Sequence, residues 1–202
     1  MNDAQQKLDQ VILKWDEKPS SVALEELAAL ISAGANPSSM TIPIYKGAGG
    51  KTSALIISAA MGLDGVVELF LLDEGLDVRA LDSDGEHAFF SALYAGRPTT
   101  AKLLFERSDV CGFGGWGTSC LSAAIGSDLA ALAEQIIGRM NDQERQETLA
   151  DMREDILTRD DLMGQEALEA HIMALLQSKI EQAAMEDSLK AKGVGPRKPR
   201  SL

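Results

Sequence analysis

The chain has 202 residues, of which 31 are acidic and 19 basic, so its formal net charge is −12 at pH 7. Such an acidic body repels phosphate backbones, which argues against nucleic-acid binding through it. The sequence lacks the run of about 18 uncharged apolar residues that a membrane span needs, and its N-terminus has no signal-peptide pattern. Its two cysteines argue against a disulfide-stabilised secreted scaffold. We therefore predict a cytoplasmic monomer with no membrane partner; a secreted microbial effector is the alternative.

Two amphipathic helices are predicted at the N-terminus. Residues 3–15 carry apolar side chains three or four positions apart, which is the spacing of one helical face: Leu8, Val11, Ile12 and Trp15. Residues 22–34 form the second helix, with serines before it as N-caps and Gly34 suited to the left-handed residue after its last turn. The pair is interpreted as an N-terminal capping unit.

A long loop follows at residues 38–50. Ile42, Ile44 and Tyr45 lie around Pro43 in this loop, a pattern that favours an extended or hairpin finger over a helix. Two roles are open for Tyr45, as a partner contact or as a side chain that packs back onto the body.

The same loop contains YKGAGGKT, which resembles the phosphate-binding motif G-x-x-x-x-G-K-[ST]. Tyr45 stands where that motif needs its first glycine. The preceding SMTIPI is short and contains a proline, so it is a poor match to the buried strand that the motif requires. The main interpretation assigns Gly50 and Thr52 to a repeat turn, and a small nucleotide-binding enzyme is the alternative function.

Glycines recur through the middle of the chain with a period of about 33 residues. The first set is Gly50, Gly85 and Gly117, at intervals of 35 and 32, and the second set is Gly62, Gly96 and Gly126, at intervals of 34 and 30. Each period carries a turn and two short helical patterns. This arrangement indicates a solenoid of stacked repeats, not a closed globular fold.

In the unit that begins at Gly50, two helix faces are predicted. The inner face is Leu55, Ile56, Ala59 and Ala60, and the outer face is Val66, Val67, Leu69, Phe70 and Leu71. Asp82 and Asp84 follow in a turn. The first and twelfth ligands of a calcium loop are missing there, so both carboxylates are expected to accept backbone amides.

The turn at residues 109–120 has four glycines together with Phe113 and Trp116. Tryptophan is enriched among residues that dominate interface energies, so Trp116 is either an interface residue or a cover for the end of the stack. Cys111 and Cys120, taken with His87, lack both a zinc spacing and a fourth ligand. The cysteines are interpreted as buried apolar side chains, and no metal or cofactor is expected.

After residue 140 the glycine period fades and two longer helices are predicted. Asn141 and Glu144 form a variant of the capping box at the start of the first helix. The second helix, residues 165–189, has His171 on its surface beside an apolar stripe of Leu168, Ile172, Leu175, Leu176 and Ile180. The last residues, 188–202, have five basic and no acidic side chains and are predicted to be a disordered basic tail.

The repeats resemble ankyrin repeats over residues 20–140. The unit from Gly50 matches at Gly50, Thr52, Leu55, Ser58, Ala59, Gly62, Val66, Val67, Leu69, Phe70 and the closing run 75–80, and the next unit matches at Phe89, Ala92, Gly96, Leu103 and Leu104. In that second unit His87 and Ala88 replace the family's Thr-Pro. The resemblance implies an all-α ankyrin-repeat solenoid of about four units, in which paired antiparallel helices are joined by turns or hairpin-like loops.

We predict a repeat stack over residues 1–140, a C-terminal helical cap over 141–187 and the tail over 188–202; the units of the stack are 3–49, 50–84, 85–116 and 117–140. The implied function is non-enzymatic binding of a protein partner of unknown identity, which the module regulates or neutralises. By the positions that ankyrin proteins commonly use, the partner-binding residues are Tyr45, Met61, Arg79, Asp82, Tyr94, Arg97, Phe113 and Trp116.

Overall fold

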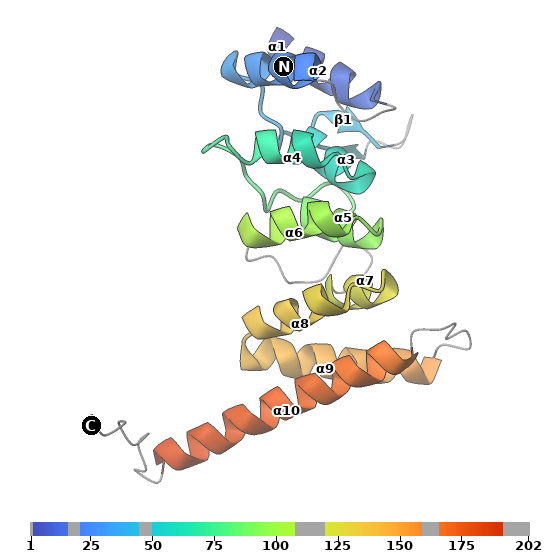
Figure 1. Ribbon diagram of the computed structural model, residues 1–202, viewed down its shortest axis with the longest axis vertical. Coiled ribbons are helices and arrows are strands. Elements are labelled where there is room, and N and C mark those ends of the chain that lie inside the picture. Colours follow the sequence, from blue (N-terminus) through green and yellow to red (C-terminus); the bar gives the residue numbers. More distant parts are fainter. Residues whose placement is uncertain (1, 16–20, 45–49, 108–119, 159–165, 192–202) are drawn as a thin grey trace. The chain divides into compact units, whose positions relative to one another are not determined.

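The computed structural model describes residues 2–15, 21–44, 50–107, 120–158 and 166–191 (Figure 1). In these ranges the chain is all-α except for one two-stranded ribbon, as predicted. It separates into two compact units, residues 1–132 and 133–202.

The first unit is built from helical pairs. Its elements are α1 (Asp3–Leu13), α2 (Ser21–Ser32), β1 (Ile42–Pro43), β2 (Lys51–Thr52), α3 (Ala54–Met61), α4 (Asp64–Phe70), α5 (Ala88–Tyr94), α6 (Pro98–Arg107), α7 (Cys120–Gly126) and the start of α8 (Ala130–Arg139). The first helices of the pairs contact one another in chain order, α1 with α3, α3 with α5 and α5 with α7. The second helices of the pairs form another row beside the first, in which α2 contacts α4 and α4 contacts α6 (Figure 1).

Three of the helical pairs, α3–α4, α5–α6 and α7–α8, are helical hairpins that turn at a residue with left-handed backbone conformation. These residues are Gly62 (φ +74°), Gly96 (φ +63°) and Asp128 (φ +56°). The amide of Gly62 donates to the carbonyl of Ala59 at 3.1 Å, and the next amide donates to the carbonyl of Ser58 at 3.0 Å; the turns at 96 and 128 repeat both bonds. This Schellman pattern satisfies carbonyls that the end of a helix leaves unpaired.

The third turn corrects the predicted glycine set. Gly126 is the last residue of α7, and the left-handed position belongs to Asp128. Glycine is the usual residue there, but aspartate is one of the few others that tolerate the conformation. Counted this way, the turns are 34 and 32 residues apart. The starts of α3, α5 and α7, and those of α4, α6 and α8, have the same two intervals.

The core of the first unit combines alanine and aliphatic side chains with four buried phenylalanines, Phe70, Phe89, Phe90 and Phe105. Of the two faces expected in the Gly50 unit, six side chains are buried, namely Leu55, Ile56, Ala59, Val66, Val67 and Phe70, whereas Ala60, Leu69 and Leu71 are partly exposed. The first residues of the inner helices, Ala54, Ala88 and Cys120, have no exposed surface. Small side chains at this repeated position let neighbouring helices approach closely.

The loop after α2 contains the predicted finger, which is a β-hairpin. β1 and β2 are antiparallel, with Ile42 opposite Thr52 and Pro43 opposite Lys51. The amide of Ile44 adds a bond to the carbonyl of Gly50 at 3.0 Å. The hairpin is therefore confirmed at its base, while Tyr45 lies outside the described residues.

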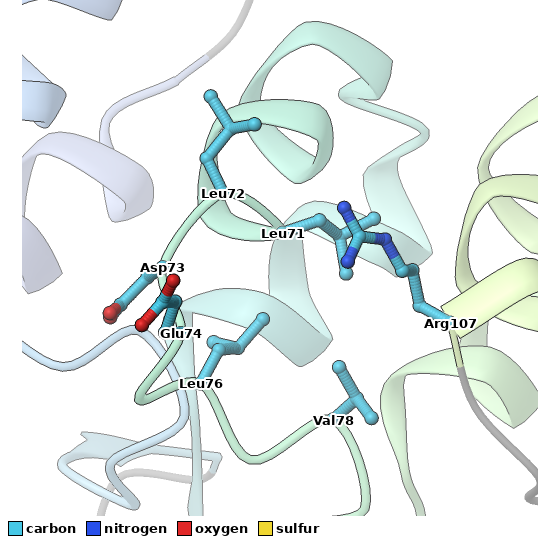
Figure 2. A pocket seen from close by; sticks show the side chains of 7 residues that line it. All are labelled: Leu71, Leu72, Asp73, Glu74, Leu76, Val78 and Arg107. Atoms are coloured by element: carbon cyan, nitrogen blue, oxygen red, sulfur yellow. The ribbon is translucent and has the colours of Figure 1, made fainter.

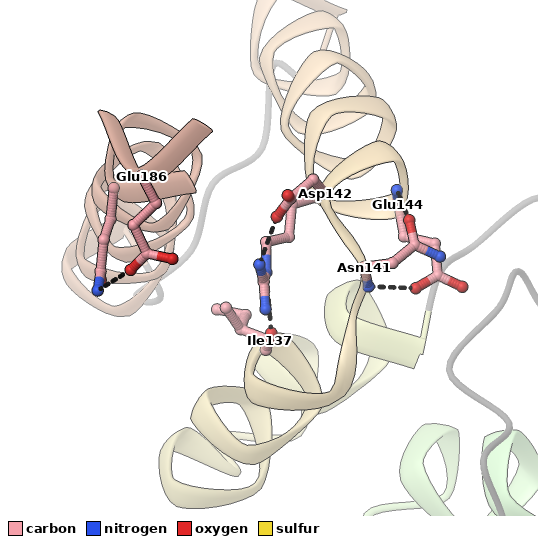
Figure 3. Close-up of polar contacts among 7 residues, drawn as sticks. Ile137, Asn141, Asp142, Glu144 and Glu186 are labelled. Carbon is pink, nitrogen blue, oxygen red and sulfur yellow. Dashed lines mark hydrogen bonds and ion pairs between the residues drawn. The ribbon is translucent and has the colours of Figure 1, made fainter. Parts of the chain in front are cut away.

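The second unit contains the rest of α8, α9 (Asp142–Thr158) and α10 (Glu166–Ala191). The predicted capping box is confirmed: the amide of Glu144 donates to Asn141 Oδ1 at 3.0 Å, and the amide of Asn141 donates to Glu144 Oε2 at 2.7 Å (Figure 3). Arg145 adds a bond from its Nε to the carbonyl of Ile137 at 3.3 Å. α9 and α10 contact each other, and their buried side chains include Leu149, Met152, Ile172 and Leu176.

Candidate functional site

Five of the eight predicted partner-binding residues can be placed. Tyr45, Phe113 and Trp116 lie outside the described residues. The other five fall into two places on the first unit. Met61, Tyr94 and Arg97 lie at the turns after α3 and α5, and Arg79 and Asp82 lie in the turn before α5.

The structure brings Met61, Tyr94 and Arg97 to adjacent turns, which we call the Gly62–Gly96 surface. Met61 ends α3 and is 37% exposed, and Tyr94 ends α5 and is 72% exposed. The side chain of Arg97 extends from the second turn to the first, where its Nε donates to the carbonyl of Ala60 at 3.2 Å. A hollow of about 200 Å³ lies between the two turns.

Side-chain hydrogen bonds between successive units hold these turns in place. The hydroxyl of Thr100 in α6 is bonded to the carboxylate of Asp64 in α4. One period later, Ser127 Oγ donates to the carbonyl of Leu93 at 2.6 Å. A surface that is fixed before binding loses less conformational entropy when a partner docks.

Tyr94 has the geometry of an aromatic anchor. Its ring stacks on that of Phe90 with centroids 5.9 Å apart and an interplanar angle of 23°, and Phe90 itself is buried. One part of the tyrosine is thereby held while most of its surface stays exposed. Rigid aromatic side chains of this kind contribute large contact area at low entropic cost.

Arg79 and Asp82 occupy a separate turn. Asp82 Oδ1 accepts the amides of Asp84 at 2.9 Å and Glu86 at 3.0 Å, so the predicted turn role of this carboxylate is confirmed. Arg79 is exposed, and its backbone amide donates to Asp77 Oδ1 at 3.0 Å. The turn is thus fixed by its own aspartates, with the Arg79 side chain on its surface.

His87 has a role that the sequence did not reveal. It is the N-cap of α5: its Nδ1 accepts the amide of Phe90 at 3.1 Å. Burial lowers the pKa of His87 to about 4, so the ring is neutral near pH 7. A signal was present in its spacing, since Ser53 stands 34 residues earlier and caps α3 in the same way, accepting the amide of Ile56 at 3.2 Å.

The other ring nitrogen of His87, Nε2, lies 3.8 Å from the sulfur of Cys120. Because Nδ1 accepts a hydrogen bond, the proton of the neutral ring is on Nε2, which therefore cannot take the thiol proton. Cys120 is buried, as predicted, and its sulfur is a weak acceptor for the Nε2 proton of His87. Cys111 lies outside the described residues, among which no group of three or more histidine, cysteine or acidic side chains is placed to hold a metal ion.

The described part of YKGAGGKT differs from the phosphate-binding arrangement. Lys51 and Thr52 form β2 and do not begin a helix, because α3 starts only after its cap, Ser53. Thr52 is buried, and its hydroxyl has no hydrogen-bond partner among the described residues. A strand with a buried threonine hydroxyl differs from the helix start at which the motif's threonine binds magnesium. Residues 45–49 lie outside the described residues.

A second hollow, which the sequence reading missed, lies beside the end of α4. This pocket of about 350 Å³ is lined by Leu71, Leu72, Asp73, Glu74, Leu76, Val78 and Arg107 (Figure 2). Leu72 is 73% exposed. The run LLDEGLDV at residues 71–78, with four aliphatic and three acidic side chains directly after a short helix, is the sequence signal for it.

His171 is confirmed as a surface residue of α10. Its side chain is 57% exposed, and its Nε2 lies 3.0 Å from Glu134 Oε1. Among the helices that the structure describes, none is both long enough and apolar enough to cross a membrane. No protein-family model matches the sequence, and a search of curated proteins finds no match.

Proposed function

We propose that the chain is an ankyrin-like solenoid of about four units that acts as a non-enzymatic protein-interaction module. Its partner would be recognised through the Gly62–Gly96 surface, with Arg79 and the Tyr45, Phe113 and Trp116 positions as further contacts. The observation that carries the proposal is the repetition of one hairpin geometry, with left-handed turns at Gly62, Gly96 and Asp128.

The repetition supports this function because a stack of equal hairpins presents its turns as a row. In that row Met61 and Tyr94 are exposed at the ends of successive inner helices. Arg97 adds a cation between them, tied by its Nε to Ala60 while the residue as a whole is exposed. An exposed aromatic ring, a methionine and an arginine are the residue types enriched at protein interfaces.

The remaining regions are given supporting roles. The α1–α2 pair would cap the stack, since terminal repeats have one face without a neighbour and tend to be atypical. The predicted basic tail is proposed to be dispensable for binding through the turns; its first four residues, 188–191, belong to the end of α10 and are not disordered as predicted.

Affinity capture from the native organism tests the proposal. The full chain and a Met61→Ala/Tyr94→Ala variant are used as baits, and a Leu13→Ala/Leu189→Ala variant is the matched control, because those leucines are 58% and 43% exposed and lie on α1 and α10. We expect a partner that wild type and control recover equally and that the turn variant recovers about tenfold less.

Equal recovery of every partner by all three baits, with unchanged circular dichroism, would refute the interface assignment. A Tyr45→Ala/Trp116→Ala bait tests the two further aromatic positions in the same experiment. Recovery unaffected by that pair would restrict the interface to the Gly62–Gly96 surface.

The nucleotide-binding alternative is tested by thermal unfolding with and without MgATP or MgGTP. A site filled at 100 times its dissociation constant adds about 2.7 kcal/mol to the free energy of unfolding. We expect no shift, because Lys51 and Thr52 lie in a strand with the threonine hydroxyl buried. A shift of that size would favour the enzyme interpretation.

A further inference from the structure

The pocket beside the end of α4 shares no residue with the Gly62–Gly96 surface. Its wall combines apolar side chains with charges that lie on opposite sides: Asp73 and Glu74 on one side and Arg107 on the other (Figure 2). α4 ends at Phe70, and the chain then turns, with the amide of Leu76 donating to the carbonyl of Asp73 at 3.2 Å. That turn places the acidic pair next to Leu72 and Leu76 on the wall of the pocket.

Leu72 is the apolar feature that a ligand would cover. Its side chain is the most exposed of the large hydrophobic residues that the structure describes, at 73%. Burying a leucine side chain is favourable by about 25 cal/mol for each Å² removed from water. A cavity of about 350 Å³ beside it is large enough to accept one large side chain.

The charge around the pocket selects among ligands. The lining has two carboxylates, Asp73 and Glu74, and one cation, Arg107, and the segment 64–86 that supplies the carboxylates has a net charge of −7. Among the described residues, none forms a hydrogen bond or ion pair with the side chains of Glu74 or Arg107. Phosphorylated ligands and anionic lipid surfaces are repelled by such a field, whereas a lysine or arginine is attracted.

We infer that this pocket docks a short segment of a partner protein that carries one large apolar side chain next to a lysine or arginine. The apolar side chain would pack against Leu72 and Leu76, and the cation would lie beside Glu74 and Asp73. Arg107, on the opposite side, would bind a backbone carbonyl or a carboxylate of the same segment. The inference rests on the proposed function, since it names the chemistry of one partner surface.

The test is selection of a phage-displayed library of random twelve-residue peptides on the full chain. We expect enriched peptides to combine a leucine, methionine or aromatic residue with adjacent lysine or arginine. Binding of a synthetic enriched peptide should fall about tenfold with Leu72→Ser and with Glu74→Lys, and it should weaken as salt is added. Asp73 is left intact because its Oδ1 accepts the amide of Gly75 at 3.0 Å and so shapes the turn.

Matched controls distinguish binding at the pocket from non-specific binding elsewhere on the surface. Leu81→Ser removes another exposed leucine, 54% exposed, outside the pocket, and Glu26→Lys reverses an exposed charge on α2. Both should leave peptide affinity within about twofold of wild type. Enrichment of acidic peptides, failure to enrich any peptide, or equal loss with the controls would overturn the inference.

The same peptides distinguish this inference from the proposed function. Peptides that lose affinity with Met61→Ala/Tyr94→Ala and keep it with Leu72→Ser would support binding at the turns and refute the pocket. Peptides that respond only to the pocket variants would support the pocket and leave the Gly62–Gly96 surface to the capture experiment.

Discussion

The α3–α4 hairpin and the α5–α6 hairpin have the same backbone plan, 34 residues apart, but different side chains hold it. Ser53 caps α3 with a hydroxyl, and His87 caps α5 with an imidazole nitrogen. Both side chains are buried, yet only the histidine can take up a proton between pH 4 and pH 7. The N-cap of α3 is therefore insensitive to pH, whereas the N-cap of α5 is sensitive to it.

The same comparison extends to two further positions. Buried Ser58 in α3 corresponds to Ala92 in α5, and the serine hydroxyl has no hydrogen-bond partner among the residues that the structure describes. A Cβ at Gly62 would clash with the Arg97 side chain, whereas a Cβ at Gly96 would only reach van der Waals contact with Ser127 Oγ, at 3.9 Å. The backbone of a repeat thus depends on a cap, a small buried residue and a left-handed turn, and each can be supplied by more than one side chain.

The largest difference between the hairpins is expected from acidification. The unfolded chain protonates His87 near pH 6.5 and the folded chain only near pH 4, so the unfolded state binds more protons in between. The stabilisation that neutral His87 contributes is fully present above about pH 6.5. As the pH drops to about 4, the free energy of unfolding falls by about 3 kcal/mol.

Urea unfolding of wild type and His87→Ser across this pH range measures that loss. The serine copies the Ser53 cap and removes the titrating group, while the carboxylates common to both proteins titrate alike. Wild type should therefore lose more stability on acidification than the variant. Parallel pH profiles would show that burial of His87 does not lower its pKa.

Alanine at the two glycine turns should give the next largest difference. Both substitutions place a side chain in the left-handed region, which costs about 1 kcal/mol. At Gly62 a Cβ would also lie 2.8 Å from Cδ of Arg97, so that arginine must move and its bond to Ala60 is strained. We expect Gly62→Ala to cost about 2 kcal/mol and Gly96→Ala about 1 kcal/mol by chemical denaturation.

An equal loss of stability for both substitutions would mean that the Arg97 side chain moves aside without an energetic penalty. A Gly62→Ala/Arg97→Ala double variant isolates the clash, because removing the long side chain should return the cost of Gly62→Ala to that of Gly96→Ala.

A smaller effect of opposite sign is expected at the buried serine. Ser58→Ala removes an unpaired hydroxyl and should raise the free energy of unfolding by about 1 kcal/mol. The reverse change in the second hairpin, Ala92→Ser, should lower it by a similar amount. Destabilisation by Ser58→Ala would reveal a hydrogen bond for that hydroxyl.

The smallest effect concerns the third turn. Asp128→Gly gives this turn the residue of the other two and should stabilise the protein by up to about 1 kcal/mol, because glycine adopts positive φ without strain. Thermal unfolding is sensitive enough to detect the increase. A loss of stability would show that the aspartate side chain contributes to the turn.

The sequence was sufficient for the elements that depend on local chemistry. Apolar spacing predicted α1 and α2, Gly34 predicted the end of α2, and Asn141 with Glu144 predicted the start of α9, since each signal acts within a few residues. The period was also visible as a set of glycines, but its third member, Gly126, lies in α7, and the left-handed residue of the third turn is Asp128, which gives no compositional signal.

The candidate site was only partly predictable, for a different reason. Met61 and Tyr94 could be placed at helix ends by counting, but the reach of Arg97 to Ala60 and the capping by His87 depend on how successive hairpins pack. The pocket around Leu72 likewise combines the end of α4 with Arg107 of α6, which lie more than 30 residues apart in the chain.

Duplicating one period tests the proposed repeat stack most directly. A second copy of residues 53–86, inserted after Glu86, adds one cap, one hairpin and one turn in register. In a stack whose units contact only their neighbours, the longer chain keeps its helical content per residue and unfolds cooperatively at a temperature no lower than wild type. Loss of helical circular dichroism or of cooperative unfolding in the lengthened chain would contradict the stack.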